Sequence, residues 1–483
     1  MEGGAVVRAM TFRAGVMLGI VAGLVALSAG SQMAPAAEKV QRPDTQAPFA
    51  IQDVPPDYDP HFNGLGVRWV RLSGAAGAVW DADEPTPGTF EWQRLDSIIG
   101  GYSRRGMNML VTVLSFNRWD RGLPPGANAA VPLPVDLPHN MDAYKSYLRA
   151  LVLRYPAVRY WQIENEPDGN GWKDTPERFA ILVKESYLTI KQANPEARVV
   201  LAGAALPEGF YRFYLPMLAA LSGMKDAPDS RYFDVADIHW SGQFGGNYRM
   251  HTPTAGRLAE FLPDLAVKLS ASGYDNMPVW ITEMSNYDGL PAPEPLGNGD
   301  TYVFLRHSEL KHAAEVIKSN IFPPAHGVSK VFWVRLDEWP NYCGPGGNCY
   351  WDNTGLINNP QNDGQRHKKL AYYAYKLMVE KLAEADWRSI ETVWESDDCF
   401  VYKLNRNNRP VWAAWNDNVQ EKQITITGIP SHQVTITEAI PGVDSGKDVV
   451  SYHAAFSKRN IPVKGGAVSF VLKERPVYVE VKN

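Results

Sequence analysis

The stretch Tyr160-Trp161-Gln162-Ile163-Glu164-Asn165-Glu166-Pro167 decides how this sequence folds. It is an apolar and aromatic run of the kind found in a buried strand, and it closes on polar residues and a proline. Proline cannot donate a hydrogen bond to a strand ladder, so Pro167 ends the pairing and begins a loop. We therefore expect Asn165 and Glu166 at the carboxyl end of a strand.

A second run of the same kind lies far downstream. Val279-Trp280-Ile281-Thr282-Glu283 follows Pro278 and also ends in a glutamate. The intervening chain is long enough for three further strand and helix units. If the two strands are parallel, their glutamates lie at the same end of one sheet.

Strands and helices alternate over most of the chain, and eight strands are expected, at residues 48–51, 67–72, 109–115, 160–164, 199–204, 233–239, 279–282 and 331–334. The clearest helix is 141–155, which Asn140 can cap and Pro156 ends; similar patterns occupy 176–193 and 308–320. Near-continuous apolar strands that alternate with amphipathic helices indicate a parallel sheet, and eight units indicate a closed (β/α)8 TIM barrel. The structural rival is an open doubly wound sheet, but no Gly-rich phosphate turn follows an early strand.

The sequence changes character after about residue 385. Short strand-like runs at 400–404, 411–415, 423–427, 433–436, 467–472 and 477–481 are separated by Asn, Gly, Asp and Pro turns. They predict a small C-terminal β-sandwich, for which we favour a structural role over sugar binding. The expected division is a secretory signal peptide at 1–37, a catalytic barrel at 46–385 and a β-sandwich domain at 386–483.

The N-terminus is typical of an exported protein. Arg8 and Arg13 precede an apolar run from Ala14 to Ala29, and small residues follow at cleavage spacing. An uncleaved anchor is the alternative, although the run is shorter than the roughly 20 residues of a spanning helix. We expect a periplasmic or extracellular protein with no transmembrane segment in the mature chain. In that compartment Cys343 and Cys349, which flank a Gly- and Pro-rich loop, can form a disulfide.

Composition excludes several classes of function. The 483 residues carry a net charge of -5, with no run of Lys or Arg, so no nucleic-acid partner is expected. The ten histidines show no paired spacing of the zinc-protease type, and the sequence has no nucleophile elbow and no phosphate loop. We predict an enzyme that needs no metal or cofactor, acts on carbohydrate and is a monomer.

Two carboxylates on the ends of parallel strands are the groups that a retaining glycoside hydrolase requires. One carboxyl group protonates the leaving oxygen and the other attacks the anomeric carbon, at a separation of ~5–5.5 Å. We assign Glu166 as the acid/base and Glu283 as the nucleophile. Glu164 has the same strand parity as Glu166 and is expected to support the site without acting as a catalyst.

Further site residues are expected on other strands. Arg71 lies near the end of the second strand, from which it could reach Glu283, whereas Arg68 is expected to point outward. Asn165 can bind a sugar 2-hydroxyl. Other candidates for substrate binding are His239 and Trp240 on the sixth strand, Trp333 on the eighth strand as a stacking surface, and Asn117 in the loop after the third strand.

Together, the Asn165-Glu166-Pro167 and Thr282-Glu283 motifs resemble clan A of the retaining glycoside hydrolases, as do Val70-Arg71, His239 and Trp333. The resemblance spans the whole barrel and is greatest to family 39, with family 5 as the nearest rival. It implies a (β/α)8 fold, net retention, and the two glutamate roles given above. One departure is visible, because many relatives carry an aromatic residue two positions after the histidine, where this chain has Ser241.

The leading functional hypothesis is a secreted retaining glycosidase, with endo action on an exopolysaccharide favoured over an exo-acting β-xylosidase-like activity. A catalytically silent sugar-binding barrel is a hypothesis from another class. Such proteins usually lose one carboxylate, and both are present here. A transglycosidase that uses the same pair is a third hypothesis.

Overall fold

The computed structural model describes residues 47–54, 59–124, 135–169, 171–241, 248–249, 256–295, 301–339, 342–344, 348–418 and 420–482. The predicted signal peptide at 1–37 lies outside these ranges. Among the described residues, no helix combines the length and apolar character that a membrane crossing requires.

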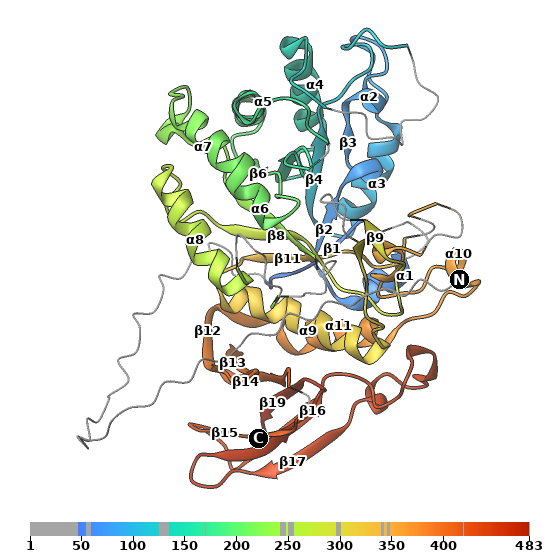
Figure 1. Ribbon diagram of the computed structural model, residues 1–483, viewed down its shortest axis with the longest axis vertical. Coiled ribbons are helices and arrows are strands. Elements are labelled where there is room, and N and C mark those ends of the chain that lie inside the picture. Colours follow the sequence, from blue (N-terminus) through green and yellow to red (C-terminus); the bar gives the residue numbers. More distant parts are fainter. Residues whose placement is uncertain are drawn as a thin grey trace, which may run out of the picture. The chain divides into compact units, whose positions relative to one another are not determined.

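Eight parallel strands of the described chain form a barrel (Figure 1). In chain order they are β1 (Phe49–Gln52), β2 (Trp69–Leu72), β4 (Asn108–Leu114), β5 (Tyr160–Ile163), β6 (Arg198–Leu201), β7 (Ala236–Ser241), β8 (Val279–Ser285) and β11 (Lys330–Trp333). Each of these strands except β6 pairs with the next in this order, and β11 pairs with β1. Isolated bridges from Val200 to Val235 and from Ala204 to Ile238 join β6 to β7. The predicted barrel is confirmed.

The helices lie between the strands. They are α1 (Asp59–Leu65), α2 (Trp80–Asp83), α3 (Gln93–Arg104), α4 (Met141–Arg154), α5 (Pro176–Ala193), α6 (Pro207–Gly209), α7 (Leu215–Ser222), α8 (Leu258–Ala271) and α9 (Glu309–Ala325), followed by α10 (Pro360–Asp363) and α11 (Leu370–Leu382). The side chain of Asn140 caps α4, as predicted, by accepting a hydrogen bond from the Ala143 amide. Thr175 and Ser308 cap α5 and α9 in the same way.

The barrel interior changes from apolar to polar along its axis. An apolar cluster includes Trp69, Trp280 and Phe332 near the middle or amino ends of their strands. One layer further towards the carboxyl ends, the buried side chains are Gln52, Arg71, Gln162 and Asp237. Because buried charges need partners, this polar layer predicts a functional mouth at the carboxyl end of the barrel.

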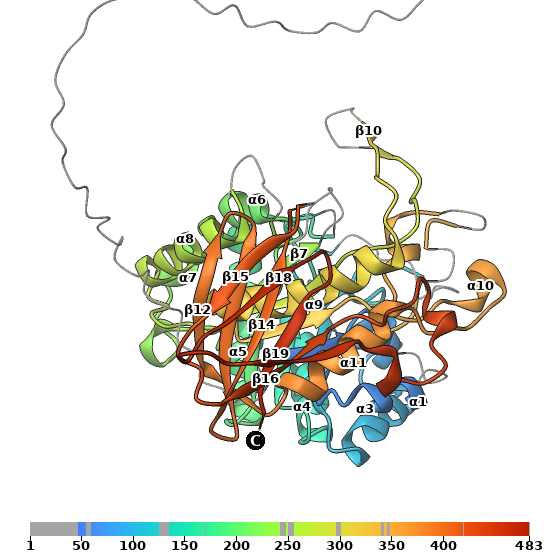
Figure 2. The same ribbon diagram turned by 90° about the horizontal axis from the view of Figure 1, so that it is seen from below.

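The C-terminal region consists of two antiparallel sheets, whose strands spread across the view in Figure 2. One sheet has the order β12 (Ala385–Ser396), β13 (Cys399–Arg406), β14 (Arg409–Asn416), β19 (Val477–Val481), β16 (Gln433–Glu438) and β17 (Lys458–Pro462), and the other pairs β15 (Lys422–Ile426) with β18 (Val468–Leu472). Val401, Ile424 and Phe470 belong to one apolar core shared by both sheets. This is the predicted β-sandwich.

The opposite face of the larger sheet packs on barrel helices. Phe400 of β13 lies 5.9 Å from Phe322 of α9 between ring centroids, and the Lys318 ammonium of α9 donates to Asp417 at 2.8 Å. These contacts agree with a structural role for the C-terminal region. The three-part division at residues 37 and 385 stays a prediction.

Candidate active site

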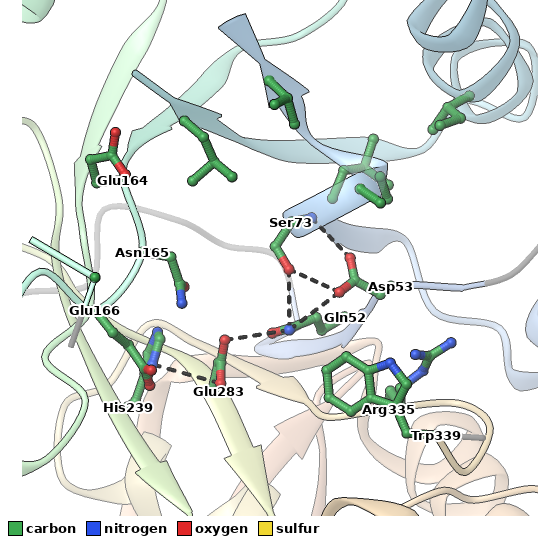
Figure 3. A pocket seen from close by; sticks show the side chains of 18 of the residues that line it. Gln52, Asp53, Ser73, Glu164, Asn165, Glu166, His239, Glu283, Arg335 and Trp339 are labelled. Atoms are coloured by element: carbon green, nitrogen blue, oxygen red, sulfur yellow. Dashed lines mark hydrogen bonds and ion pairs between the residues drawn. The ribbon is translucent and has the colours of Figure 1, made fainter. Parts of the chain in front are cut away.

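The two predicted glutamates meet at the mouth of the barrel (Figure 3). Glu166 follows β5 and Glu283 lies within β8, and both line a cavity of about 1250 Å³. Three atoms lie within 4.8 Å of one another: one carboxylate oxygen of Glu166, one of Glu283 and a ring nitrogen of His239. The structure therefore brings together two carboxylates that are distant in sequence.

The backbone after β5 is unusual at both glutamates. Glu164 and Glu166 have φ values of 67° and 46°, in the left-handed region that residues other than glycine rarely adopt. The strand ladder consequently ends at Ile163, one residue earlier than predicted. Non-glycine residues in such conformations cluster at active sites, where the surrounding structure holds them in place.

Arg71 of β2 organises the β8 side of the cavity, as predicted. Its side chain is fully buried, and Nη1 donates to Glu283 Oε1 at 2.7 Å. Nη2 donates to Asn165 Oδ1 at 2.6 Å. The remaining donors reach Gln52 Oε1 at 2.7 Å and Gln162 Oε1 at 2.9 Å. This planar fork fixes Glu283 and Asn165 relative to each other.

Glu283 is held as a carboxylate. Burial alone would raise its pKa, but the positive charges of His239 and Arg71 outweigh burial and lower the pKa of Glu283 below its usual value. The Gln52 amide adds a longer contact of 3.4 Å to Oε1. An ionised, desolvated carboxylate with fixed orientation is suited to nucleophilic attack.

His239 of β7 connects the two glutamates. Nδ1 lies 2.7 Å from Glu166 Oε1 and 3.7 Å from Glu283 Oε2. Burial alone would lower the pKa of His239, but Glu283 and Glu166, with a smaller contribution from Asp237, raise it to about 9. The ring is therefore an imidazolium at neutral pH.

A second layer orients this ring. His239 Nε2 lies 3.1 Å from Thr282 Oγ1, and that hydroxyl donates to Asp237 Oδ2 at 2.5 Å. Gln162 Nε2 donates to the same oxygen at 2.6 Å. Burial raises the pKa of Asp237 to about 6 against the charges of His239 and Arg71.

Asn165 and Glu164 differ in what they offer a ligand. Since Asn165 Oδ1 accepts from Arg71, its Nδ2 group is left to donate into the cavity. Glu164 Oε1 accepts from both the amide and the hydroxyl of Ser115, at 2.6 and 2.5 Å. Burial raises the pKa of Glu164 to about 7. Glu164 thus supports the loop behind Glu166, as expected.

Trp240 and Trp333 do not lie where we predicted. Consecutive strand residues face opposite sides, and His239 and Phe332 occupy the inward positions of β7 and β11. Trp240 instead packs on Phe261 of α8, with ring centroids 5.8 Å apart, and Trp333 lies 5.8 Å from the His312 ring of α9. Both indoles are core residues between strands and helices.

The prediction for Asn117 was also wrong. Its Nδ2 donates to the carbonyls of Trp80 and Glu84, at 3.1 and 2.9 Å, and its Oδ1 accepts from the Trp119 amide. The side chain is fully buried, and all its polar atoms are used in holding the loop after β4. Asn117 is therefore a loop-fixing residue and not a ligand for substrate.

Other cavity residues were missed. Gln52 lines the cavity, whereas Gln162 belongs to the buried polar layer of the barrel; both are polar residues inside apolar strands, and that signal could have identified them. Asp53, Ser73, Arg335, Trp339 and Tyr342 also line the cavity. Most of them lie in loops, for which strand parity makes no prediction.

The predicted disulfide joins Cys343 and Cys349, next to Tyr342 of the cavity wall. The thiolates that could bind a metal with Asp352 are therefore consumed. The ligand atoms of Glu166, His239 and Glu283 also lie close enough together to hold a metal ion. Metal-independent action stays a prediction.

No family model matches the sequence, and no curated protein is significantly similar to it. The fold is nevertheless similar to that of solved structures. A family 39 glycoside hydrolase from Bacteroides cellulosilyticus WH2 aligns with a TM-score of 0.64 and 17% identity, over 91% of this chain and 81% of the other. A monomeric β-xylosidase from Caulobacter crescentus CB15 aligns with a TM-score of 0.57 and 15% identity, over 92% and 98%.

A GH30 endoxylanase from Clostridium papyrosolvens C71 aligns with a TM-score of 0.53 and 14% identity, over 92% of this chain and 98% of the other. The similarity therefore covers the barrel and the C-terminal sheets together. At this level of identity it concerns the fold, and in this respect the resemblance to family 39 is confirmed.

Proposed function

We propose that the protein is a retaining O-glycoside hydrolase with Glu283 as nucleophile and Glu166 as acid/base. The observation that carries this proposal is the proximity of the two carboxylates, with oxygens within 4.8 Å of each other. Carboxyl groups ~5–5.5 Å apart are typical of retaining enzymes, whereas inverting enzymes separate them by ~6.5–9.5 Å to admit a water molecule.

In the first step, an oxygen of Glu283 forms a bond to the anomeric carbon as the bond from that carbon to the leaving oxygen breaks. Glu283 Oε2 suits this role because Oε1 is occupied by Arg71. The leaving oxygen takes a proton from Glu166. In the second step, water attacks the same carbon, its proton passes to Glu166, and the ester to Glu283 is released.

Glu166 needs a proton before the first step. The Glu166 side chain is 35% exposed, so it is open to the cavity in which the leaving oxygen would lie. His239 Nδ1 lies 2.7 Å from Glu166 Oε1 and can pass its proton to that oxygen. After release of the leaving group, the same contact stabilises the carboxylate that activates water.

The cavity favours a carbohydrate longer than one sugar. Its volume of about 1250 Å³ exceeds the ~300–1,000 Å³ of common small-molecule sites, and Trp339, Tyr342 and Trp351 line one wall. Aromatic rings stack on the apolar faces of sugars. We therefore favour endo action on an exported polysaccharide, outside the cytoplasm, over removal of single sugars from chain ends.

The mechanism can be tested by trapping the intermediate. Activated 2-deoxy-2-fluoro glycosides slow both steps, and we expect one of a panel to inactivate the enzyme and leave a sugar ester on Glu283, located by peptide mass spectrometry. Proton NMR of early products should show the anomer of the substrate. Inverted product, or a label on another residue, would contradict the proposal.

Substrate and mode of action require a screen of the protein from Glu38 onward against diverse polysaccharides. Reducing ends and polymer size should be followed together. Endo action gives a rapid fall in polymer size. Release of monosaccharide at constant polymer size would establish exo action, and sugar binding without any turnover would establish a silent barrel. Products extended by an added acceptor sugar would identify a transglycosidase.

A further inference from the structure

The cavity contains a polar corner beside Glu283 that the two-glutamate mechanism does not use. It consists of Asp53, which follows β1, and of Arg335 and Trp339, which follow β11. In the view of Figure 3 these side chains lie on the side of Glu283 away from Glu166.

Arg335 is fixed from behind by a buried carboxylate. Nε and Nη2 both reach Asp337 Oδ1, at 2.9 and 2.8 Å, and Asp337 is 1% exposed. The guanidinium also lies 4.8 Å from the centroid of the Trp339 ring. Among the described residues, none accepts a hydrogen bond from Nη1, and this nitrogen remains as a donor for a ligand in the cavity.

Asp53 is fixed in a similar way. Its Oδ1 and Oδ2 accept from the amide and the hydroxyl of Ser73, each at 2.8 Å. Burial raises the pKa of Asp53, and Arg335 is the strongest of the charges that act against this rise. The two side chains thus face each other closely enough to interact through their charges.

The corner is connected to the nucleophile. Gln52 Nε2 lies 3.4 Å from Asp53 Oδ2, 3.2 Å from Ser73 Oγ and 3.4 Å from Glu283 Oε1. A sugar whose anomeric carbon approaches Glu283 therefore lies within reach of the corner. Recognition there acts on the sugar that becomes attached to the enzyme.

We propose that Asp53 and Arg335 select an uncharged sugar at the position next to Glu283, by binding two neighbouring hydroxyl groups as acceptor and donor while Trp339 covers the apolar side of the ring. This inference rests on the proposed function. A diol satisfies both a carboxylate and a guanidinium. A uronic acid would bring a carboxylate towards Asp53 and Glu283, while the charge of Arg335 is already balanced by Asp337.

Binding of free monosaccharides tests this inference without turnover. Each probe is a matched pair, such as glucose with glucuronate, galactose with galacturonate and mannose with mannuronate, measured by calorimetry and saturation-transfer NMR. In the wild type we expect at least one neutral sugar to bind about tenfold or more tighter than its uronate, because the uronate faces like charge.

Asp53→Asn should reduce this ratio severalfold, mainly by improving uronate binding. Arg335→Gln should weaken the neutral sugar. Asp226→Asn serves as a control, since Asp226 also pairs with a cation, Lys184, but does not line the cavity; its ratio should match the wild type. Thermal unfolding and circular dichroism identify variants that fail to fold, and Asp53→Ser is then the second variant.

Three results would overturn the inference: uronates that bind the wild type as tightly as neutral sugars, an Asp53→Asn ratio equal to that of Asp226→Asn, or no binding of any neutral sugar up to its solubility limit. The proposed function fails separately. If the protein shows the expected binding ratios but hydrolyses no substrate, the proposed hydrolase function is refuted and the selection of uncharged sugars stands. If the enzyme is active but lacks these ratios, only the proposed selection is refuted.

Discussion

The β8 and β5 sides of the cavity surround the same residue type in opposite ways. On the β8 side, the Glu283 side chain is 12% exposed and is held by Arg71 and Gln52. On the β5 side, the Glu166 side chain is 35% exposed and contacts His239. Fixed positive charge keeps Glu283 ionised, whereas Glu166 is more open to the cavity. In the mechanism proposed above, environment and not residue type assigns Glu283 as nucleophile and Glu166 as acid/base.

Removing the carboxylate on the β8 side should have the largest effect. Glu283→Gln keeps the shape but cannot form the covalent ester, so we expect kcat on an aryl glycoside to fall by about 10⁴-fold or more, in the range seen when other enzymes lose a nucleophile. Steady-state kinetics measure this loss. Activity of Glu283→Gln within tenfold of the wild type would remove the assignment.

Removing the carboxylate on the β5 side should be milder and dependent on the substrate. Glu166→Ala loses acid/base assistance, which contributes about 10²–10⁴-fold, and a good leaving group needs less of it. We expect a large loss for an alkyl or natural leaving group and a small one for the first step with dinitrophenolate. Azide should restore turnover and give a glycosyl azide with the anomeric configuration of the substrate. A glycosyl azide of inverted configuration would instead identify Glu166 as the nucleophile and Glu283 as the acid/base.

Arg71 tests whether the difference between the two sides has an electrostatic origin. Arg71→Met leaves Glu283 buried without its closest cation, so the acidic limb of the kcat/KM profile should move upward by about 1–3 pH units. Breaking a buried pair also costs about 3–5 kcal/mol of unfolding free energy. Arg68→Met is the matched control, because Arg68 is exposed on the same segment. An unchanged acidic limb in a folded Arg71→Met protein would show that Glu283 does not depend on Arg71.

The strands that carry these residues could be predicted because their signals are local. Two strands could be predicted from apolar runs that end at Glu166 and Glu283. One helix could be predicted from the cap at Asn140 and the proline at 156, and none of these predictions needs tertiary information. The role of Arg71 could also be predicted, because an arginine near the end of an apolar strand needs a buried partner. All three residues lie on barrel strands or directly after one.

The errors arose where a prediction required knowledge of which strand face is inward. His239 and Trp240 are neighbours and cannot both face the cavity while β7 continues to Ser241. In β11 either Phe332 or Trp333 could have filled the interior, and Phe332 does. Arg335 and Trp339 were missed because loop geometry, which depends on contacts such as that with Asp337, places them.

The smallest effect is expected at Glu164, two residues before Glu166 on the β5 side. Burial raises its pKa to about 7 from about 4.5. The folded state therefore binds more protons than the unfolded state between these values, and wild-type stability falls as pH rises through this window. Glu164→Gln does not titrate and can still accept from Ser115, so its advantage in unfolding free energy should grow from pH 4.5 to 7, by on the order of 3 kcal/mol, and then level off.

Urea denaturation of both proteins across this pH range measures the difference, and the same samples report activity. Because Glu164 holds a loop and does not contact the sugar, kcat should change far less than in Glu166→Ala. A loss of kcat as large as that of Glu166→Ala, with stability unchanged across the window, would mean that the acid/base role had been placed two residues too late. Such a result would also end the contrast between the two sides, since Glu164, like the groups that hold Glu283, is buried.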